Sequence, residues 1–258
     1  MNVIIYETFE KVKVFEKRQA EEMDINTKLA VLDQIYRVYD DFTGKLDLAC
    51  QKYCAHCCTC NVTLTTLEGY RIARHLISSG QSSLFEKLQS VLSSKRFQPV
   101  VTTNQLAQLC ALEKDLPLES SDPAWGPCPL LRNDECIVYS QRPFGCRCMV
   151  SKHDCQEAGY AEMDPLVLTL NNVCLQYIEH VDAHGFTGNL SDVLGVTAKE
   201  QNRQKYKSSK LKVAGTSLVA NRPIKVLMIP PEHRHEVKPI LDALNRIQVP
   251  NLKSLKRF

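Results

Sequence analysis

The sequence predicts a mainly α-helical protein in which an irregular, cysteine-rich metal-binding insert packs against a helical bundle. Apolar residues recur at helical spacing in several segments that open with capping residues. The stretch 116–162 instead holds five prolines and few regular apolar repeats. Ten of the twelve cysteines lie between Cys54 and Cys155, a concentration that a random scatter would not produce.

The first well-defined helix is expected to begin near residue 26, where Asn26 or Thr27 can act as the N-cap. Its apolar positions are Leu29, Leu32, Ile35, Tyr36, Tyr39, Phe42 and Leu46. This helical periodicity runs toward the first cysteines. The preceding segment, from Tyr6 to Glu22, has the pattern of a more polar helix.

The next helix follows the first cysteines. Thr65 and Glu68 form a capping-box pattern ahead of LEGYRIARHLISS, because each side chain can satisfy a backbone N–H group at the helix start. Gly80 is expected to end this helix.

Later helices carry similar signals. Ser83 and Glu86 repeat the capping-box spacing, and Asp164 with Pro165 forms a cap and first helical position before a long helix that Gly185 closes. The predicted ranges are 84–92, 103–114, 165–184 and, with Pro239 early inside it, 232–247.

These elements suggest three segments along the chain: N-terminal helices (1–48), a cysteine-cluster metal-binding domain (49–190), and a basic linker with a C-terminal helix (191–258). In the last segment, residues 199–212 carry six lysines and arginines against one glutamate. A solvated linker is favoured over a surface for an acidic partner or RNA, because no RNA-binding signature accompanies the charge. A protein partner stays open, as does the oligomeric state.

The composition indicates a soluble globular protein, with 44% hydrophobic and 24% charged residues. A net charge of +3 does not by itself argue for nucleic acid. The N-terminus lacks the pattern of a signal peptide, and no apolar run approaches the ~18 residues that span a bilayer. We therefore expect a cytoplasmic protein without a membrane segment. In that reducing compartment dense cysteines indicate metal or redox sites before disulfides.

Three groups of cysteines are the candidate metal ligands. They are Cys54, Cys57, Cys58 and Cys60; Cys128 and Cys136; and Cys146, Cys148 and Cys155. Thiolate is a soft, anionic ligand that suits zinc, iron–sulfur clusters and copper(I). The predicted cofactors are zinc or iron ions, or an iron–sulfur cluster.

The number and spacing of these thiols limit the arrangement. If the preceding helix continued to the motif, Cys54, Cys57 and Cys58 would share one helical face. Neighbours such as Cys57 and Cys58 are poorly placed to chelate the same ion. Nine thiols also exceed one tetrahedral site, so the candidates are a cluster, two ions, or one site with spare thiols. Whether the centre performs chemistry or only cross-links an irregular segment is left open.

Several other residues could in principle act as ligands. His56 and His153 lie among the thiols and are expected to be exposed or outside the ligand set. Cys174 and Cys110 fall on apolar helical stretches and are expected in the core, whereas Cys50 fits either role.

The segment QRPFGCRC carries two arginines beside a cysteine. Pro143 can begin a helical turn, and backbone N–H groups together with the charge of Arg147 are expected to lower the pKa of Cys146. Arg142 and Arg147 are also expected to pin this loop through hydrogen bonds.

The run CPLLRNDECIVYSQRPFGCR, together with CAHCCTC and TLTTLEGYRIARHL, resembles the YkgJ-type cysteine-cluster family, whose members are described as zinc- or iron-chelating proteins. The later block is the more specific one, and its matching positions are Cys128, Pro129, Leu130, Leu131, Cys136, Val138, Tyr139, Arg142, Pro143, Cys146 and Arg147. The first cluster departs from the family pattern, reading CxxCCxC where the family has CxxCxxCC.

The resemblance implies a metal-chelating function. Because the family includes flagellin lysine methylases, it also implies an alternative, a cluster-dependent protein-modifying enzyme of the lysine N-methylase kind or a redox protein. The sequence shows no glycine-rich strand–helix turn for a nucleotide-like cofactor and no common hydrolase motif. A third reading is a scaffold whose metal site only folds an interaction surface.

Overall fold

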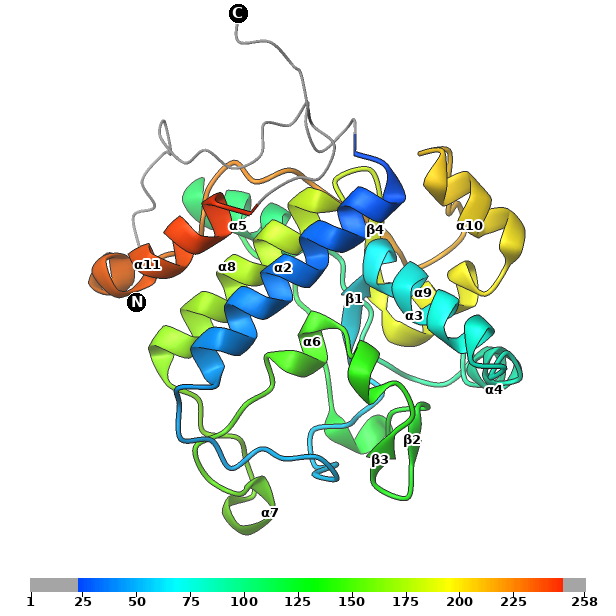
Figure 1. Cartoon of the computed structure of the whole chain (residues 1–258), viewed down its shortest axis with the longest axis horizontal. Coiled ribbons are helices and arrows are strands. Elements are labelled where there is room, and N and C mark those ends of the chain that lie inside the picture. The colour runs from blue at the N-terminus through cyan, green and yellow to red at the C-terminus, as the bar shows by residue number, and fades with distance from the viewer. Residues whose placement is uncertain (1–22, 248–258) are drawn as a thin grey trace, which may run out of the picture.

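The computed structural model describes residues 23–247, so the helix predicted from Tyr6 to Glu22 lies outside the described residues. The fold is mainly α, as predicted, with about 49% of the described residues helical. Figure 1 shows the arrangement. The α-helices are α2 (Ile25–Thr43), α3 (Thr66–Ser78), α4 (Leu84–Ser90), α5 (Thr103–Ala111), α6 (Phe144–Arg147), α7 (Cys155–Ala158), α8 (Pro165–Val181), α9 (Leu190–Thr197), α10 (Glu200–Lys207) and α11 (Arg234–Asn245).

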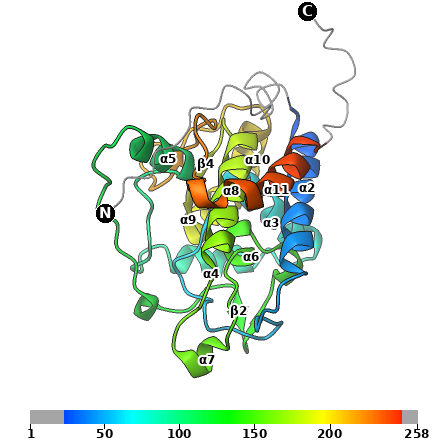
Figure 2. The same cartoon turned by 90° about the vertical axis from the view of Figure 1, so that its left-hand side faces the viewer.

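The main core lies where α2, α8 and α11 pack together, and Figures 1 and 2 both show α2 beside α8. Each of these helices turns one apolar face inward, as its helical spacing predicts. Ile35 of α2, Val173 of α8 and Val237 of α11 are fully buried there. A second core cluster joins α3, α4 and α9 through residues such as Ile72 and Val193. Helices α2, α5 and α11 thus pack around α8, whereas α3 and α4 pack on α9.

Two of the four predicted helix caps are confirmed. Thr65 and Glu68 form the capping box of α3, and Asp164 accepts a hydrogen bond from the backbone N–H of Leu166 at the start of α8. Two predictions are wrong. Asp24, not Asn26 or Thr27, caps α2, because its carboxylate accepts the Thr27 N–H at 2.8 Å. Ser83 has helical backbone angles and makes no capping hydrogen bond to α4.

The first long helix does not reach the cysteines. It ends at Thr43, and the backbone N–H of Gly44 bonds back to the carbonyl of Asp40 at 2.8 Å. Glycine has low helix propensity, and turns and irregular backbone follow it up to residue 62. The expectation that Cys54, Cys57 and Cys58 share a helical face is therefore wrong.

A small sheet, which the sequence analysis did not predict, connects the helical layers. Its strands are β1 (Thr63–Thr65), β4 (Phe186–Asn189) and β5 (Val219–Ala220), in the antiparallel order β1-β4-β5. Leu64 pairs with Gly188 in this register. A separate hairpin consists of β2 (Leu131–Arg132) and β3 (Glu135–Cys136). The sheet holds the end of the first cysteine segment against the start of α9.

The basic segment 199–212 is partly folded. Helix α10 packs on α9, and its Tyr206 is buried and donates a hydrogen bond to the carboxylate of Asp182 at 2.6 Å. The predicted linker therefore includes a packed helix, while the lysines that flank Tyr206 are exposed. Within residues 23–247, no helix combines the length and apolar character that crossing a bilayer requires.

A buried carboxyl group is expected to make stability pH-dependent. Glu179 of α8 is 2% exposed and accepts the backbone N–H groups of Asn104 and Arg222, each at 2.7 Å. Burial raises its pKa from 4.5 to about 7, and burial also raises the pKa of nearby Asp182. Between these pH values the native state binds more protons than the unfolded state. The free energy of unfolding should therefore fall by up to about 3 kcal/mol as the pH rises from 4.5 to 7.

Denaturant titrations of the wild type and of Glu179→Gln across that pH range test this dependence. The variant lacks the titrating group and should show a shallower slope. The matched control is Glu232→Gln, on an exposed glutamate, which should keep the wild-type slope. Equal slopes in the wild type and Glu179→Gln would contradict the assignment.

Candidate metal centre

Six of the nine predicted ligands line one small cavity of about 70 Å³. They are Cys54, Cys57, Cys58, Cys128, Cys136 and Cys146. Cys50, which the sequence left undecided, also lies in its wall, together with Tyr139, Arg142 and Met149. Its lining residues come from the loop after α2, the hairpin β2–β3 and the segment around α6; Figure 1 draws the hairpin and that loop in its lower part. Members of all three predicted groups are therefore brought together.

A short backbone ladder joins the first two groups. The N–H of Cys128 donates to the carbonyl of Cys58 at 2.8 Å, and the N–H of Cys60 donates to the carbonyl of Gly126 at 2.9 Å. Thr59 and Pro127 form the antiparallel bridge between these bonds. The approach of Cys58 to Cys128 is thus built into the main chain and does not depend on side-chain contacts.

A tight hairpin places Cys136 near Cys128. Asn133 and Asp134 both have positive φ angles, of 48° and 61°, and form the two-residue turn between β2 and β3. These residue types tolerate that backbone region, which two-residue hairpins of this kind require. Cys136 consequently pairs with Leu131, whose N–H bonds to the Cys128 carbonyl at 3.0 Å. The Asn-Asp pair is a hairpin signal that the sequence analysis did not use.

Helix α6 carries Cys146 to the cavity. The predicted helical turn after Pro143 is present, with Pro143 as its N-cap. Phe144 is fully buried and its ring meets Tyr39 edge-on, at 4.8 Å between centroids. The following Gly145 lies against β1 so closely that an added Cβ would sit 2.7 Å from the carbonyl oxygen of Thr63. Only glycine allows this approach, which fixes the position of Cys146.

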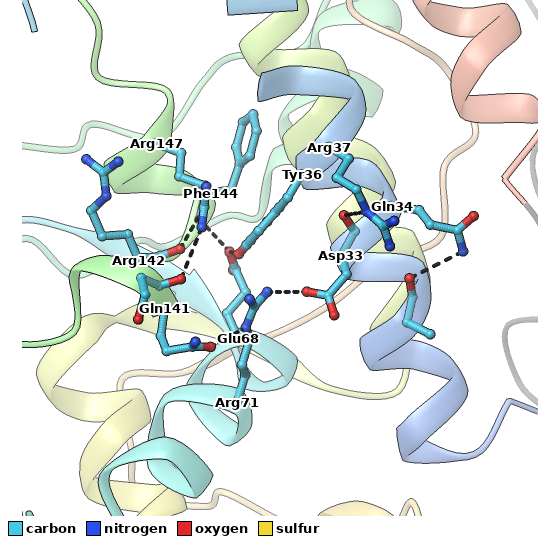
Figure 3. Close-up of polar contacts among 12 residues, drawn as sticks. Asp33, Gln34, Tyr36, Arg37, Glu68, Arg71, Gln141, Arg142, Phe144 and Arg147 are labelled. Carbon is cyan, nitrogen blue, oxygen red and sulfur yellow. Dashed lines mark hydrogen bonds and ion pairs between the residues drawn. The ribbon is translucent and has the colours of Figure 1, made fainter. Parts of the chain in front are cut away.

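Glu68 ties α6 to two other helices, as Figure 3 shows. Its side chain is 2% exposed. Oε1 accepts hydrogen bonds from the Tyr36 hydroxyl at 2.7 Å and from the backbone N–H of Phe144 at 2.6 Å. Oε2 accepts the N–H and the hydroxyl of Thr65, at 2.9 and 3.0 Å. The capping glutamate therefore also anchors the turn that bears Cys146.

Arg147 pins the same turn, as expected. Its Nε donates to the carbonyl of Arg142 at 3.1 Å, and Nη1 forms an ion pair with Asp40 at 3.1 Å. The expected effect on Cys146 is wrong, however. Burial raises the pKa of Cys146 well above its usual value, and the opposing charge comes from Arg142, not from Arg147. The guanidinium of Arg147 is engaged with Asp40 and stacked over the Tyr36 ring.

The thiols of the cavity differ in acidity. Burial raises the pKa of Cys128 to about 11 and also raises that of Cys136. The adjacent pair behaves differently. The interaction between the neighbouring thiols raises the pKa of Cys57 and lowers the pKa of Cys58. Cys58 is therefore favoured as the first thiolate of the pair, and the other buried thiols need a cation to ionise at neutral pH.

The structure does not bring three of the predicted ligands to this cavity. Cys60 directs its sulfur to the carbonyl of Lys95 at 3.7 Å, and Cys148 is 7% exposed and directs its sulfur to the carbonyl of Gly145 at 3.6 Å. Cys155 is buried at the start of α7. Their assignment as ligands rests on the sequence alone.

The remaining candidates lie outside the thiol cavity. Cys174 is fully buried in α8, as expected, whereas Cys110, also expected in the core, is only half-buried on α5. His153 is exposed and lies 3.4 Å from the carboxylate of Glu162. His56 lines a neighbouring surface cleft, outside the thiol cavity.

The cysteine thiols that line the cavity are a type of ligand that suits zinc or iron. All twelve cysteines lie within residues 23–247 and none forms a disulfide. Across these same residues, no three histidine, cysteine or acidic side chains stand at the spacing of a complete ligand set for one ion. The thiols are thus gathered around a small cavity, and their final approach to an ion would require local side-chain adjustment.

A larger cleft of about 650 Å³ adjoins the thiol cavity. The two share lining residues that include Tyr53, Cys54, Cys58 and Asp134. Tyr53 and Cys54 are exposed at this side. The cavity can therefore be approached from the surface through the segment that carries the first cysteines.

Comparison with known proteins identifies no relative: no family model, curated protein or solved structure matches this chain. The resemblance to the YkgJ-type family therefore stays a prediction from its motifs.

Proposed function

We propose that this is a cytoplasmic metal-binding protein that holds zinc, iron or an iron–sulfur cluster through thiolates of its three cysteine groups. The observation that carries the proposal is the convergence of six thiols, from three separate chain segments, on one cavity of about 70 Å³. Soft thiolate donors suit these metals. In the reducing compartment that this proposal assumes, the free thiols of the twelve cysteines would remain available as ligands.

The inner thiols are the proposed ligands: Cys57, Cys58, Cys128, Cys136 and Cys146, with Cys54 at the exposed side. This set exceeds the four ligands of a single tetrahedral ion. We therefore favour two ions or a cluster. The finer architecture that goes with this proposal is a cysteine-rich insert whose metal centre cross-links irregular segments against the helices.

A second candidate function is a cluster-dependent protein-modifying or redox enzyme. The observation that favours it is the cleft of about 650 Å³ beside the cavity, since a centre that only stabilises the fold needs no adjoining cleft. A bound metal centre would supply Lewis acidity or electron transfer at this position. The residues of the chain would bind and orient a substrate along the segment containing Tyr53 and Cys54.

Anaerobic purification followed by elemental and sulfide analysis tests the proposal. We expect at least one equivalent of zinc or iron per chain. Brown absorption bands with acid-labile sulfide would indicate an iron–sulfur cluster, whereas a colourless protein would indicate zinc. Protein purified without metal that neither takes up added zinc nor forms a cluster with iron and sulfide would overturn it.

The fluorescence of the tryptophan can be used to follow metal removal. Trp125 is the single tryptophan and directly precedes Gly126, whose carbonyl accepts the Cys60 N–H in the backbone ladder. We expect a chelator to change the fluorescence of Trp125 and restored metal to reverse the change. Identical fluorescence with and without bound metal would show that the ladder is insensitive to the centre.

A further inference from the structure

Arg142 lies in the wall of the thiol cavity without a carboxylate partner. Its Nε is buried and has no hydrogen-bond partner. None of the ion pairs among residues 23–247 includes Arg142, although Asp134 lines the same cavity. The neighbouring Arg147 is paired with Asp40. Arg142 therefore differs from its neighbour in having a charge and a donor that the protein itself leaves unused.

The guanidinium of Arg142 is nevertheless held in place. Its Cζ lies 3.8 Å from the centroid of the Tyr139 ring, which also lines the cavity. This is a close cation–π contact. On the main-chain side, the carbonyl of Arg142 accepts the Nε–H of Arg147 at 3.1 Å. The ring and this hydrogen bond together keep the positive charge at the cavity wall.

This charge shares the cavity with thiols of all three predicted groups. Arg142, Cys57, Cys136 and Cys146 all line the same cavity wall. A buried donor without a partner carries an energetic cost, and so does a partly buried charge without a counter-ion. Both costs would be relieved by an anionic sulfur centre, since four thiolates around a divalent ion carry a net charge of about −2.

We propose that Arg142 is the positioning residue of the metal centre, supplying its counter-charge and an N–H donor to a thiolate or sulfide sulfur. This inference rests on the proposed metal-binding function. Residues that hydrogen-bond metal ligands orient those ligands and tune the charge and reduction potential of the bound centre. Tyr139 takes part by fixing the plane of the guanidinium.

Zinc competition titrations of three variants test the inference. Arg142→Met removes the charge and the donor and should weaken zinc binding about 10-fold or more. Arg142→Lys restores the charge without the planar guanidinium and should recover part of that loss. The matched control is Arg132→Met, on an exposed arginine of the neighbouring hairpin that lines neither cavity, and its affinity should equal the wild type's.

The reduction potential of iron-loaded protein is a second measurement. It would not change if Arg142 only held the loop in place. Loss of a nearby positive charge should make the potential more negative in Arg142→Met, and Arg142→Lys should return it toward the wild-type value. If the protein binds only zinc, the recovery of zinc affinity in Arg142→Lys replaces the reduction potential as the distinguishing measurement.

The outcomes separate this inference from the proposed function. A wild-type chain that binds no metal overturns both. Wild-type binding with unchanged affinity and potential in Arg142→Met overturns the role of Arg142 alone. Equal losses in the Met and Lys variants, together with equally lowered stability of their metal-free forms, would assign Arg142 to loop packing and overturn the inference as well.

Discussion

Replacement of Cys128 by serine is expected to abolish stoichiometric metal binding. Cys128 stands where the backbone ladder meets the cavity: its N–H bonds to the carbonyl of Cys58, and its side chain lines the cavity. Serine preserves the backbone bond and nearly the size of the side chain but replaces a soft thiolate with a poor ligand for zinc or iron. We expect affinity to fall by at least about 100-fold, as measured by competition titration with zinc or by iron and sulfide content.

Two further serine variants sharpen this test. Cys110→Ser is the matched control, because Cys110 is half-buried on α5 and lies outside the cavity. It should retain full metal content. Cys60→Ser tests whether only the thiols of the cavity are ligands. Cys60 belongs to the predicted group but does not line the cavity. Its replacement should therefore reduce metal affinity less than the replacement of Cys128 does. Full metal retention in Cys128→Ser would exclude this cavity as the centre.

Replacement of Glu68 by glutamine should both destabilise the fold and weaken the centre. The carboxylate accepts hydrogen bonds on both oxygens, whereas an amide presents one acceptor and one NH₂ group. The NH₂ group of the glutamine would then face at least one buried backbone N–H, that of Thr65 or Phe144, and leave it without an acceptor. We expect the free energy of unfolding to fall by about 3 kcal/mol. Because Phe144 opens α6, metal affinity should fall as well.

Tyr36→Phe provides the control for this prediction. It removes one hydroxyl donor to Glu68 and leaves the bond from the Phe144 N–H in place. We expect a loss of about 1 kcal/mol and near-normal metal binding. Chemical denaturation of the metal-free variants separates the stability effect from the effect on affinity. A Glu68→Gln variant with wild-type affinity would show that α6 keeps its position without the carboxylate.

The sequence was most informative where structure is local. The capping box of Thr65 and Glu68 and the Asp164 cap were predicted because each involves residues only a few positions apart. The strands were missed, since β1 and β5 are too short to show alternation and their partners lie far away in the chain. The end of α2 at Thr43 was missed because apolar spacing continues to Leu46.

The candidate site was likewise predicted where its signals are local and missed where they depend on distant residues. The three cysteine groups were evident from their spacing, and six members meet at one cavity. The direction of Cys60 had no signal in the spacing, because its sulfur contacts the carbonyl of Lys95, 35 positions away in the chain. The second role of Glu68 is equally non-local, because Phe144 is separated from it by 76 positions.

The ladder between Cys58 and Cys128 also has a consequence for chain entropy. It closes a long loop, of 128 − 58 = 70 positions, with only two backbone hydrogen bonds, each worth about 1 kcal/mol net. A permanent cross-link across a loop of this length removes about 4 kcal/mol of unfolded-state entropy. An ion shared by these two cysteines would act as such a cross-link, one that forms and releases with metal supply. Amide hydrogen exchange at Cys60 and Cys128, the two donors of the ladder, would then report how much metal is available to the protein.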